Sequence, residues 1–365
     1  MRTMVRLRWF ALLLVTASAL GQSSVRSTGT SRDRVFTFSI TKPVMGLPVK
    51  GSRMQGLCSS DGLSYFDPFI NATGNSRVLD LYGVNASGEV RHLSRTAPIE
   101  FTNVIHRDFF PGDAALVTLM EAQKRDSDDA DARVRETQYF LSVQDHDGDG
   151  KKMIALDVPF KPLKVGQFGS GEFLVLGWEG ANELAQLAIL KEDGTLRRFV
   201  DVDERPAGAQ AKAARREGAT LASLTGAAFV PFGRSVLLTF PGTVRPIFVF
   251  HGSGSGSPLA LEIPEGWQLH DVLNSGFGMT LVARVQEMRD AETGNVGKAE
   301  APRQRMFEFN AFTGRRIREF SFDNVPIAAV TCAAGRSLAA IFEQPVGDAG
   351  KDDKAMELVV GTVLE

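Results

Sequence analysis

Three aspartates at alternating positions form the pattern in this chain that most resembles a metal site. Asp145, Asp147 and Asp149 precede Gly150, and a calcium loop begins with carboxylates at alternate positions and a glycine at the sixth. The match then ends, because the twelfth position is Leu156 and two lysines follow the glycine. The stretch is therefore either a calcium site or an Asp/Gly-rich hairpin turn. No other cofactor is predicted.

Two of the five histidines stand beside aspartates. His106 is followed by Arg107 and Asp108, and His270 is followed directly by Asp271. Such His and Asp groups bind metals in hydrolases and lyases when a third ligand joins them. A third ligand is not evident here, so the two motifs are either half of a metal site or ordinary His–Asp pairs.

The two cysteines, Cys58 and Cys332, occupy similar local positions. Each lies just before a turn that leads into an apolar strand, and neither has the basic neighbours that activate a nucleophilic thiol. They are therefore candidates for a disulfide, or two buried free thiols.

Sequence motifs of common enzymes are absent from the chain. It has no Gly-x-Ser-x-Gly elbow, no His-Glu-x-x-His run and no glycine fingerprint for nucleotides. No catalytic residue is predicted from motifs.

The elements that would position these residues are short β-hairpins. The segment 187–200 contains two apolar strands around Asp193-Gly194, a strong signal for a two-residue turn. Similar hairpins recur, each after another pair of strand-like segments; they lie at 79–93, 139–156, 247–263 and 306–322. Four-stranded antiparallel units at a spacing of about 40–50 residues are typical of a β-propeller.

The chain ends indicate how many units there are. After the fifth hairpin, three strand-like segments follow at 328–332, 337–342 and 356–364, and an unpaired strand lies at 35–40. The N-terminal strand would complete the last unit and remove an open sheet edge. We therefore predict an all-β, six-bladed propeller, closed by its N-terminal strand; a pair of β-sandwiches is the main alternative.

This architecture places the candidate residues relative to one another. Cys58 and Cys332 would lie on neighbouring inner strands of blades one and six, where a disulfide would close the ring. His106 and His270 would lie on inner strands of blades two and five, on opposite sides of the channel.

The outer hairpins also resemble a known group of proteins. In the segment 309–320 an aromatic strand, a glycine turn and a basic-led strand follow one another, as in six-bladed propellers of the NHL and TolB-like type. The resemblance covers about Val35 to Glu365 and implies the architecture only.

The first 19 residues have the features of a secretory signal peptide. Arg2, Arg6 and Arg8 precede a short apolar run that ends in Ala17-Ser18-Ala19. We expect an exported protein, periplasmic or secreted, with a polar leader at 20–33, one domain at 34–365 and no transmembrane segment after cleavage. Loss of the three arginines would change the formal net charge from −2 to −5. A nucleic-acid partner is not expected, because no basic cluster is present.

Four long polar insertions would emerge on one face of the propeller, at 123–136, 204–218, 286–305 and 345–354. Insertions on one face of a repeat protein often mark a binding face, although they can also be tolerated decoration. The sequence therefore predicts a non-enzymatic propeller that binds a protein or another macromolecule there. The alternative is a metal-dependent hydrolase or lyase with its site at the channel mouth.

Overall fold

The structure is a computed structural model, and it describes most of the chain from Ser24 onward. The described residues are 24–29, 34–44, 55–59, 62–67, 78–85, 90–96, 101, 103–112, 115–126, 133–146, 150, 152–180, 184–200, 226–240, 247–252, 256–276, 279–288, 303–320, 328–332, 337–345 and 354–364. The predicted signal peptide and the insertion at 204–218 lie outside these residues, so both stay predictions.

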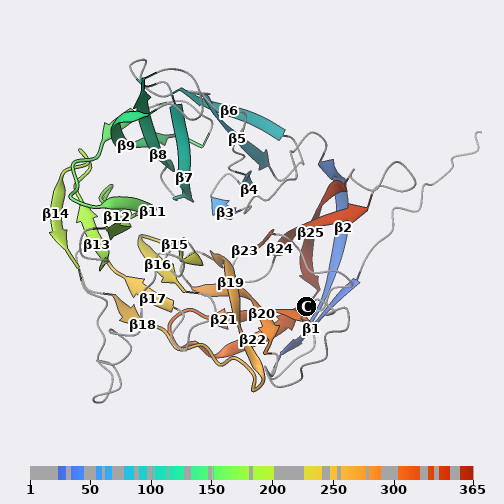
Figure 1. The fold of residues 1–365 in the computed structure, drawn as a ribbon. Helices are drawn as coiled ribbons and strands as arrows, with labels where there is room; N and C mark the ends of the chain where they lie inside the picture. Colours follow the sequence, from blue (N-terminus) through green and yellow to red (C-terminus); the bar gives the residue numbers. More distant parts are fainter. Residues whose placement is uncertain are drawn as a thin grey trace, which may run out of the picture.

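The described chain is built from antiparallel β-strands, as predicted, and its four-stranded sheets form a β-propeller (Figure 1). Four sheets have four strands each. They contain β3 (Gln55–Ser59), β4 (Gly62–Asp67), β5 (Val78–Asn85) and β6 (Val90–Thr96); β7 (Asn103–Pro111), β8 (Leu116–Arg125), β9 (Val134–Gln144) and β10 (Lys152–Ala155); β11 (Lys161–Gln167), β12 (Phe173–Glu179), β13 (Leu184–Leu190) and β14 (Leu196–Phe199); and β15 (Ala228–Phe232), β16 (Ser235–Thr239), β17 (Ile247–Phe250) and β18 (Ser257–Pro258).

A fifth sheet has nine strands and joins two further four-stranded groups. One group is β19 (Trp267–Gly276), β20 (Thr280–Glu287), β21 (Gln304–Asn310) and β22 (Arg316–Phe320). The other is β23 (Ala328–Cys332), β24 (Ser337–Pro345), β25 (Lys354–Leu364) and β2 (Arg34–Val44). The strand β1 (Ser24–Gly29) pairs with both β22 and β2 and connects the two groups.

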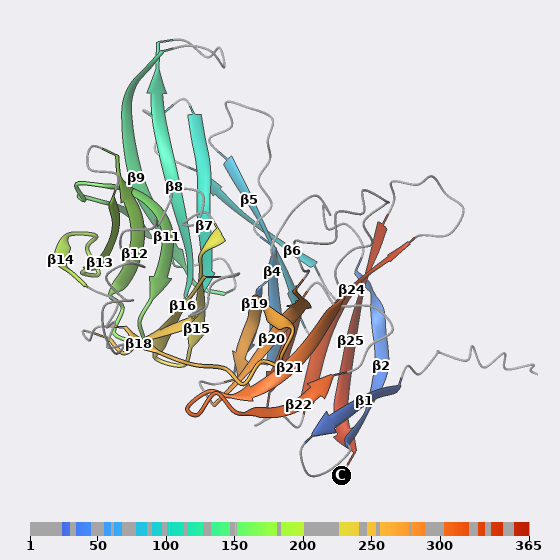
Figure 2. The ribbon, with the colours of Figure 1, turned by 60° about the horizontal axis from the view of Figure 1, so that its bottom comes forward.

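The ring closes through the N-terminal strand. β2 runs antiparallel to β25, with Val35 opposite Leu364, so the start of the chain completes the sheet formed by its end. The innermost strands adjoin one another in the order β3, β7, β11, β15, β19, β23 and back to β3. This order is consistent with six blades, and Figure 2 shows β1 beside β22 and β2, where the ends of the chain meet.

Three details differ from the expected strand pattern. β1 lies inside the segment expected to be only a polar leader, so residues 24–29 contribute a strand. β8 and β9 remain paired to Arg125 and Val134, inside the predicted insertion at 123–136. The outer strand of the fourth blade is Ser257–Pro258 rather than 259–263, because Leu259, Leu261 and Ile263 pack into the neighbouring apolar cluster.

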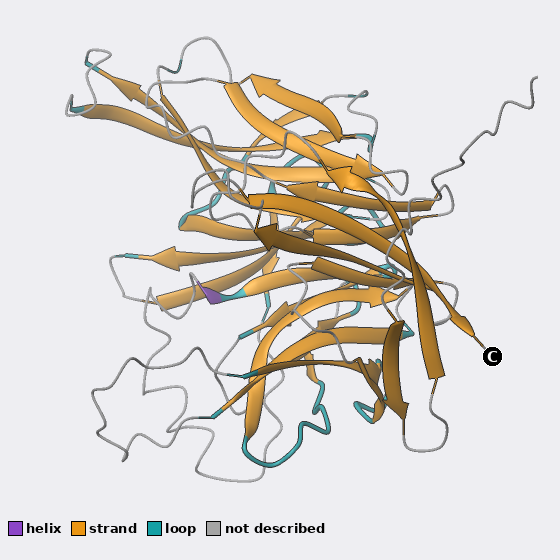
Figure 3. Cartoon of the chain, turned by 90° about the vertical axis from the view of Figure 1, so that its right-hand side faces the viewer, coloured by secondary structure: helices purple, strands orange, loops and turns teal. Residues whose placement is uncertain are grey.

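The core lies between successive sheets. One apolar cluster spans the blades from β7 to β17, and a second joins β15–β17 to β19–β21. Both clusters are rich in phenylalanine, with Phe110, Phe173, Phe250 and Phe307 almost fully buried. Strands account for nearly all of the regular structure (Figure 3). In the described part of the chain, no helix has the length and apolar character needed to cross a bilayer.

Candidate functional site

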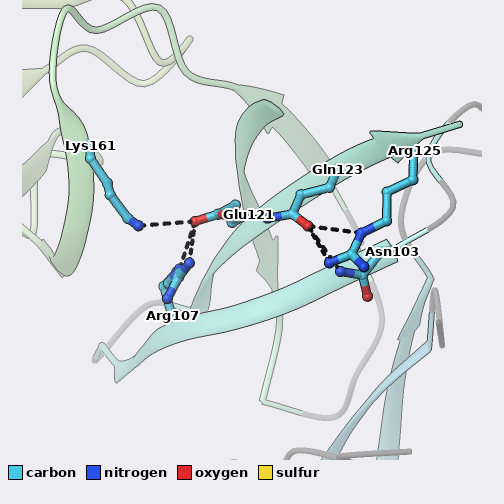
Figure 4. A network of polar contacts seen from close by, with 6 residues as sticks. All are labelled: Asn103, Arg107, Glu121, Gln123, Arg125 and Lys161. Atoms are coloured by element: carbon cyan, nitrogen blue, oxygen red, sulfur yellow. Dashed lines mark hydrogen bonds and ion pairs between the residues drawn. The ribbon is translucent and has the colours of Figure 1, made fainter. Parts of the chain in front are cut away.

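A network of polar side chains joins the second blade to the inner strand of the third (Figure 4). Its members come from β7, β8 and β11: Asn103, Arg107, Glu121, Gln123, Arg125 and Lys161. β7 and β11 are the innermost strands of adjacent blades, and β8 lies next to β7 (Figure 1).

Strand alternation explains why this network forms on one face of the second blade. Glu121 and Gln123 alternate along β8 with Met120 and Ala122, and successive strand residues point to opposite faces. Met120 and Ala122 belong to an apolar cluster that also contains Phe101, Val104 and Phe140. The polar residues therefore share the other face.

The carboxylate of Glu121 is the centre of the network. Arg107 donates two hydrogen bonds to Oε2 of Glu121, one of them from Nε at 2.8 Å. Gln123 donates from Nε2 to Oε1 at 2.6 Å, and Nζ of Lys161 lies 3.9 Å from Oε2. Glu121 is only 4% exposed. A charge buried to this extent is tolerated because charged and polar partners compensate it.

A chain of amides holds Gln123 in place. Asn103 donates from Nδ2 to Oε1 of Gln123 at 3.1 Å, and Arg125 donates from Nη2 to the same oxygen at 3.0 Å. The Gln123 oxygen therefore accepts while its nitrogen donates to Glu121. Because Gln123 is held on both sides, its bond to Oε1 fixes the orientation of the Glu121 carboxylate.

Tyr139 approaches the same carboxylate from β9, where it is paired with Glu121 in the strand register. Burial, followed by the negative charge of Glu121, raises the pKa of Tyr139 to about 12. Tyr139 therefore remains a neutral donor at physiological pH.

A second polar contact joins β7 to β11 one step further along. Asp108 accepts a hydrogen bond from the backbone N–H of Val165 at 2.9 Å, and its other oxygen lies 3.7 Å from Nζ of Lys164. The register of β7 shifts between His106 and Asp108, which is a β-bulge at Arg107. Bulges redirect side chains and are frequent beside functional sites.

The predicted channel residue His106 is not part of the Glu121 network. His106 is paired with Met120 and Glu121 with Ile105, so strand alternation places the imidazole on the face opposite Glu121. The contacts of Asp108 are with Val165 and Lys164 of β11 rather than with His106 in a His–Asp pair. Burial and the ammonium of Lys164 lower the pKa of His106 to about 4.

The second predicted channel residue, His270, lies on β19, opposite β7 in the order of inner strands. The neighbouring Asp271 forms a paired interaction with Arg284, whose Nε donates to Oδ1 at 2.8 Å. A bulge lies between Leu269 and Asp271, at a position similar to the bulge in β7. Among the described residues, no three or more His, Cys, Asp or Glu side chains come close enough together to hold a metal.

The remaining predicted site residues are only partly described. Asp145 and Gly150 border the predicted calcium loop; Gly150 has a φ of 58°, and a Cβ there would lie 2.7 Å from Oδ2 of Asp145. Asp147 and Asp149 lie outside the described residues, so the calcium site stays a prediction. Cys58 and Cys332 lie on the adjoining inner strands β3 and β23. The structure does not describe their side chains, so the disulfide stays a prediction.

Sequence reasoning missed the residues that form the network. No known motif contains these residues, which are Arg107, Glu121, Gln123 and Lys161. Glu121 directly follows an apolar run, so its sequence neighbours gave no indication of a site. The available signal was the alternation of Glu121 and Gln123 with Met120 and Ala122. This alternation indicates that the strand continues past Leu119, whereas the insertion predicted at 123–136 begins at Gln123.

Comparisons with known proteins found similar solved structures only. No family model and no curated protein matches the chain. A gluconolactonase from Xanthomonas campestris is 12% identical, covers 94% of this chain and 95% of its own, and has a TM-score of 0.41. An α-L-arabinanase from Penicillium chrysogenum is 10% identical, with coverages of 92% and 98% and a TM-score of 0.42. The dihydro-heme d1 dehydrogenase NirN is 11% identical, with coverages of 93% and 74% and a TM-score of 0.39.

These similarities correct one prediction. The neighbours are enzymes, and so are a galactanase and a xylotriose-bound glycosidase-type enzyme from Xanthomonas citri. The prediction of a non-enzymatic binding protein runs against these neighbours and is given up. At these identities and TM-scores, no substrate or catalytic residue is transferred from the neighbours to this chain.

Proposed function

We propose that the protein is an enzyme, either a hydrolase or a lyase, that cleaves a bond of a small substrate. Its site would be the wall formed by β7, β8 and β11. The observation that carries this proposal is the buried Glu121, which holds two cations from adjacent blades. Arg107 and Lys161 are 26% and 43% exposed, whereas Glu121 is 5% exposed by the same side-chain measure. The two cations are therefore partly accessible to solvent, whereas the carboxylate that orients them is buried.

Such an arrangement suits the stabilisation of negative charge. Hydrolysis and elimination both build negative charge on an oxygen in the transition state, and fixed donors aimed at that oxygen lower the barrier. Arg107 is the better candidate for this role, because two hydrogen bonds to Glu121 fix its guanidinium. Glu121, Gln123 and Tyr139 are positioning residues in this mechanism, because they act through the cations.

The broader assignment of the protein is also a proposal. We propose that it is exported, since its first 19 residues have signal-peptide features, and that it is of the NHL and TolB-like type, since its outer hairpins resemble that group. Neither proposal is needed for the chemistry of the Glu121 site.

The test is an activity screen of the purified protein with matched variants. Chromogenic esters, lactones, glycosides and uronides would be offered to wild type, Glu121→Gln and Glu172→Gln. Glu172 is the control, because it also pairs with an arginine, Arg197, but lies outside the network. We expect Glu121→Gln to lower kcat by about 10²-fold, since a small displacement of a catalytic group has an effect of this size.

The control variant should keep wild-type turnover, and circular dichroism should show that both variants are folded. Equal turnover in wild type and Glu121→Gln would contradict the assigned site. Absence of turnover on every class of substrate would contradict the proposal of hydrolysis or elimination.

A further inference from the structure

The cations at the β7–β11 wall are not fully compensated by the carboxylates that they contact. Arg107 and Lys161 share one carboxylate, Glu121. That carboxylate also accepts a hydrogen bond from Gln123, besides the two from Arg107. Because a carboxylate offers about four acceptor positions, the direct donors already occupy most of its capacity.

Lys161 is the cation with donors to spare. Its Nζ lies 3.9 Å from Oε2 of Glu121, which is beyond hydrogen-bonding distance, and its side chain is 43% exposed. An ammonium has three N–H donors. At least two of them can therefore reach another acceptor while the ion pair with Glu121 is kept.

The neighbouring carboxylate, Asp108, does not supply the missing negative charge, because it is already paired with the next lysine of β11. Lys164 contacts Asp108 at 3.7 Å, and Asp108 also accepts the N–H of Val165. The three cations Arg107, Lys161 and Lys164 thus face two carboxylates. Around Lys161 these five groups carry one excess positive charge; Arg125 is not counted, because it binds the amide oxygen of Gln123 at the other end of the network.

The opposite side of the ring has a different arrangement. On the inner strand β19, Asp271 is paired with Arg284 of β20, so a carboxylate occupies the inner strand and the pair is neutral. In the second blade the cation, Arg107, is on the inner strand and the carboxylate is on the second strand. Among these paired groups, the excess positive charge belongs to the β7–β11 side.

We propose that Lys161, supported by Arg107, forms an anion-binding subsite that takes the carboxylate group of the substrate. This inference rests on the proposed function, because it names the substrate class of the same site. One excess charge matches a monoanion, and a carboxylate can accept from the ammonium and the guanidinium together. A doubly charged phosphate would leave negative charge uncompensated.

The experiment compares pairs of probes that differ only in charge. Glucuronate against glucose, and acetate against acetamide, would be titrated by NMR into wild type, Lys161→Gln, Lys161→Arg and Lys191→Gln. Lys191 is the control, because it is exposed in the turn between β13 and β14, away from the network. Inorganic phosphate is a further arm.

We expect wild type to bind each carboxylate at least 10-fold more tightly than its neutral twin. Lys161→Gln should remove this preference, Lys161→Arg should keep most of it, and Lys191→Gln should leave it unchanged. Raising the salt concentration should weaken the preference, since the cation is partly exposed.

Equal binding of charged and neutral probes, absence of binding, or an unchanged preference in Lys161→Gln would overturn the proposal. Tighter binding of phosphate than of carboxylates would overturn the assigned substrate class. Turnover that depends on Glu121 without a carboxylate preference would leave the enzyme proposal standing and remove only this inference. A carboxylate preference without turnover would support the anion-binding subsite and contradict the enzyme proposal.

Discussion

At the scale of single residues, the structure separates groups that the sequence places side by side. His106, Arg107 and Asp108 are consecutive, yet Arg107 binds Glu121, Asp108 binds β11, and His106 lies on the face of Met120. The bulge at Arg107 produces this separation, because it breaks the strict alternation of side chains along β7. Residue type alone therefore did not indicate which of the three joins a site.

The lowered pKa of His106 predicts a pH dependence of stability. In the unfolded chain His106 would bind a proton below about pH 6.5, whereas in the folded protein it does so only below about pH 4. Between these values the unfolded state binds more protons, so the free energy of unfolding falls as the pH is lowered. We expect His106→Gln to reduce this fall, measured by urea unfolding from pH 7 to pH 4.

The matched control is His251→Gln, because His251 is exposed and lies in another blade. It should keep the wild-type dependence on pH. The prediction fails when the two variants show the same slope.

At the scale of elements, paired strands place opposite charges beside each other in two different settings. Arg107 and Glu121 lie on the inner pair β7–β8, with the arginine partly exposed and the glutamate buried. Glu308 and Arg318 lie on the outer pair β21–β22, with Nε of Arg318 2.7 Å from Oε2 of Glu308, and both are almost completely buried. The first pair belongs to the site that we propose for a substrate, whereas the second is enclosed, and we expect it to act on stability.

Removal of one partner of the buried outer pair should be costly. Arg318→Met would leave the carboxylate of Glu308 buried without this cation, and we expect a loss of about 3–5 kcal/mol in the free energy of unfolding. The double variant Glu308→Leu with Arg318→Met should recover most of that loss, because no buried charge remains. Denaturant unfolding of both variants measures the effect.

Arg315→Gln is the control, because Arg315 and Glu262 form an exposed pair at 3.8 Å. It should change the stability by less than about 1 kcal/mol. A double variant as unstable as the single one would show that the charge is not the cause.

At the scale of the whole molecule, the ring depends on contacts between the two ends of the chain. β2 pairs with β25, β1 links β2 to β22, and β23 adjoins β3. These contacts close the sheet edges that an open array of blades would expose. Cys58 and Cys332 lie on β3 and β23, beside this closure.

We predict that Cys58 and Cys332 form a disulfide when the protein is kept under oxidising conditions. A crosslink across most of the chain restricts the unfolded state, so reduction should lower stability by on the order of 2–4 kcal/mol. Thiol titration of the denatured protein, with and without reductant, measures the oxidation state, and thermal unfolding measures the effect. Two free thiols without reductant would contradict the prediction.

Much of the architecture could be derived from the sequence, because strand and turn signals are local. Asp193-Gly194 predicted its hairpin correctly, and Gly194 has a φ of 86° with Thr195 bonded to the Asp193 side chain. The repeated hairpins and the N-terminal strand correctly predicted a propeller closed by β2. The strand at 259–263 was wrong, since packing with the next blade determines the path of that segment.

The candidate site could not be derived in the same way. Strand periodicity, turn residues and apolar patterning act over a few residues, and the sequence by itself therefore determined the all-β repeat and its likeness to a ring of blades. The meeting of Arg107, Glu121 and Lys161 spans two blades, and it depends on strand register and on one bulge. Only the tertiary structure decided it, because a shift of one residue moves every side chain of a strand to its other face.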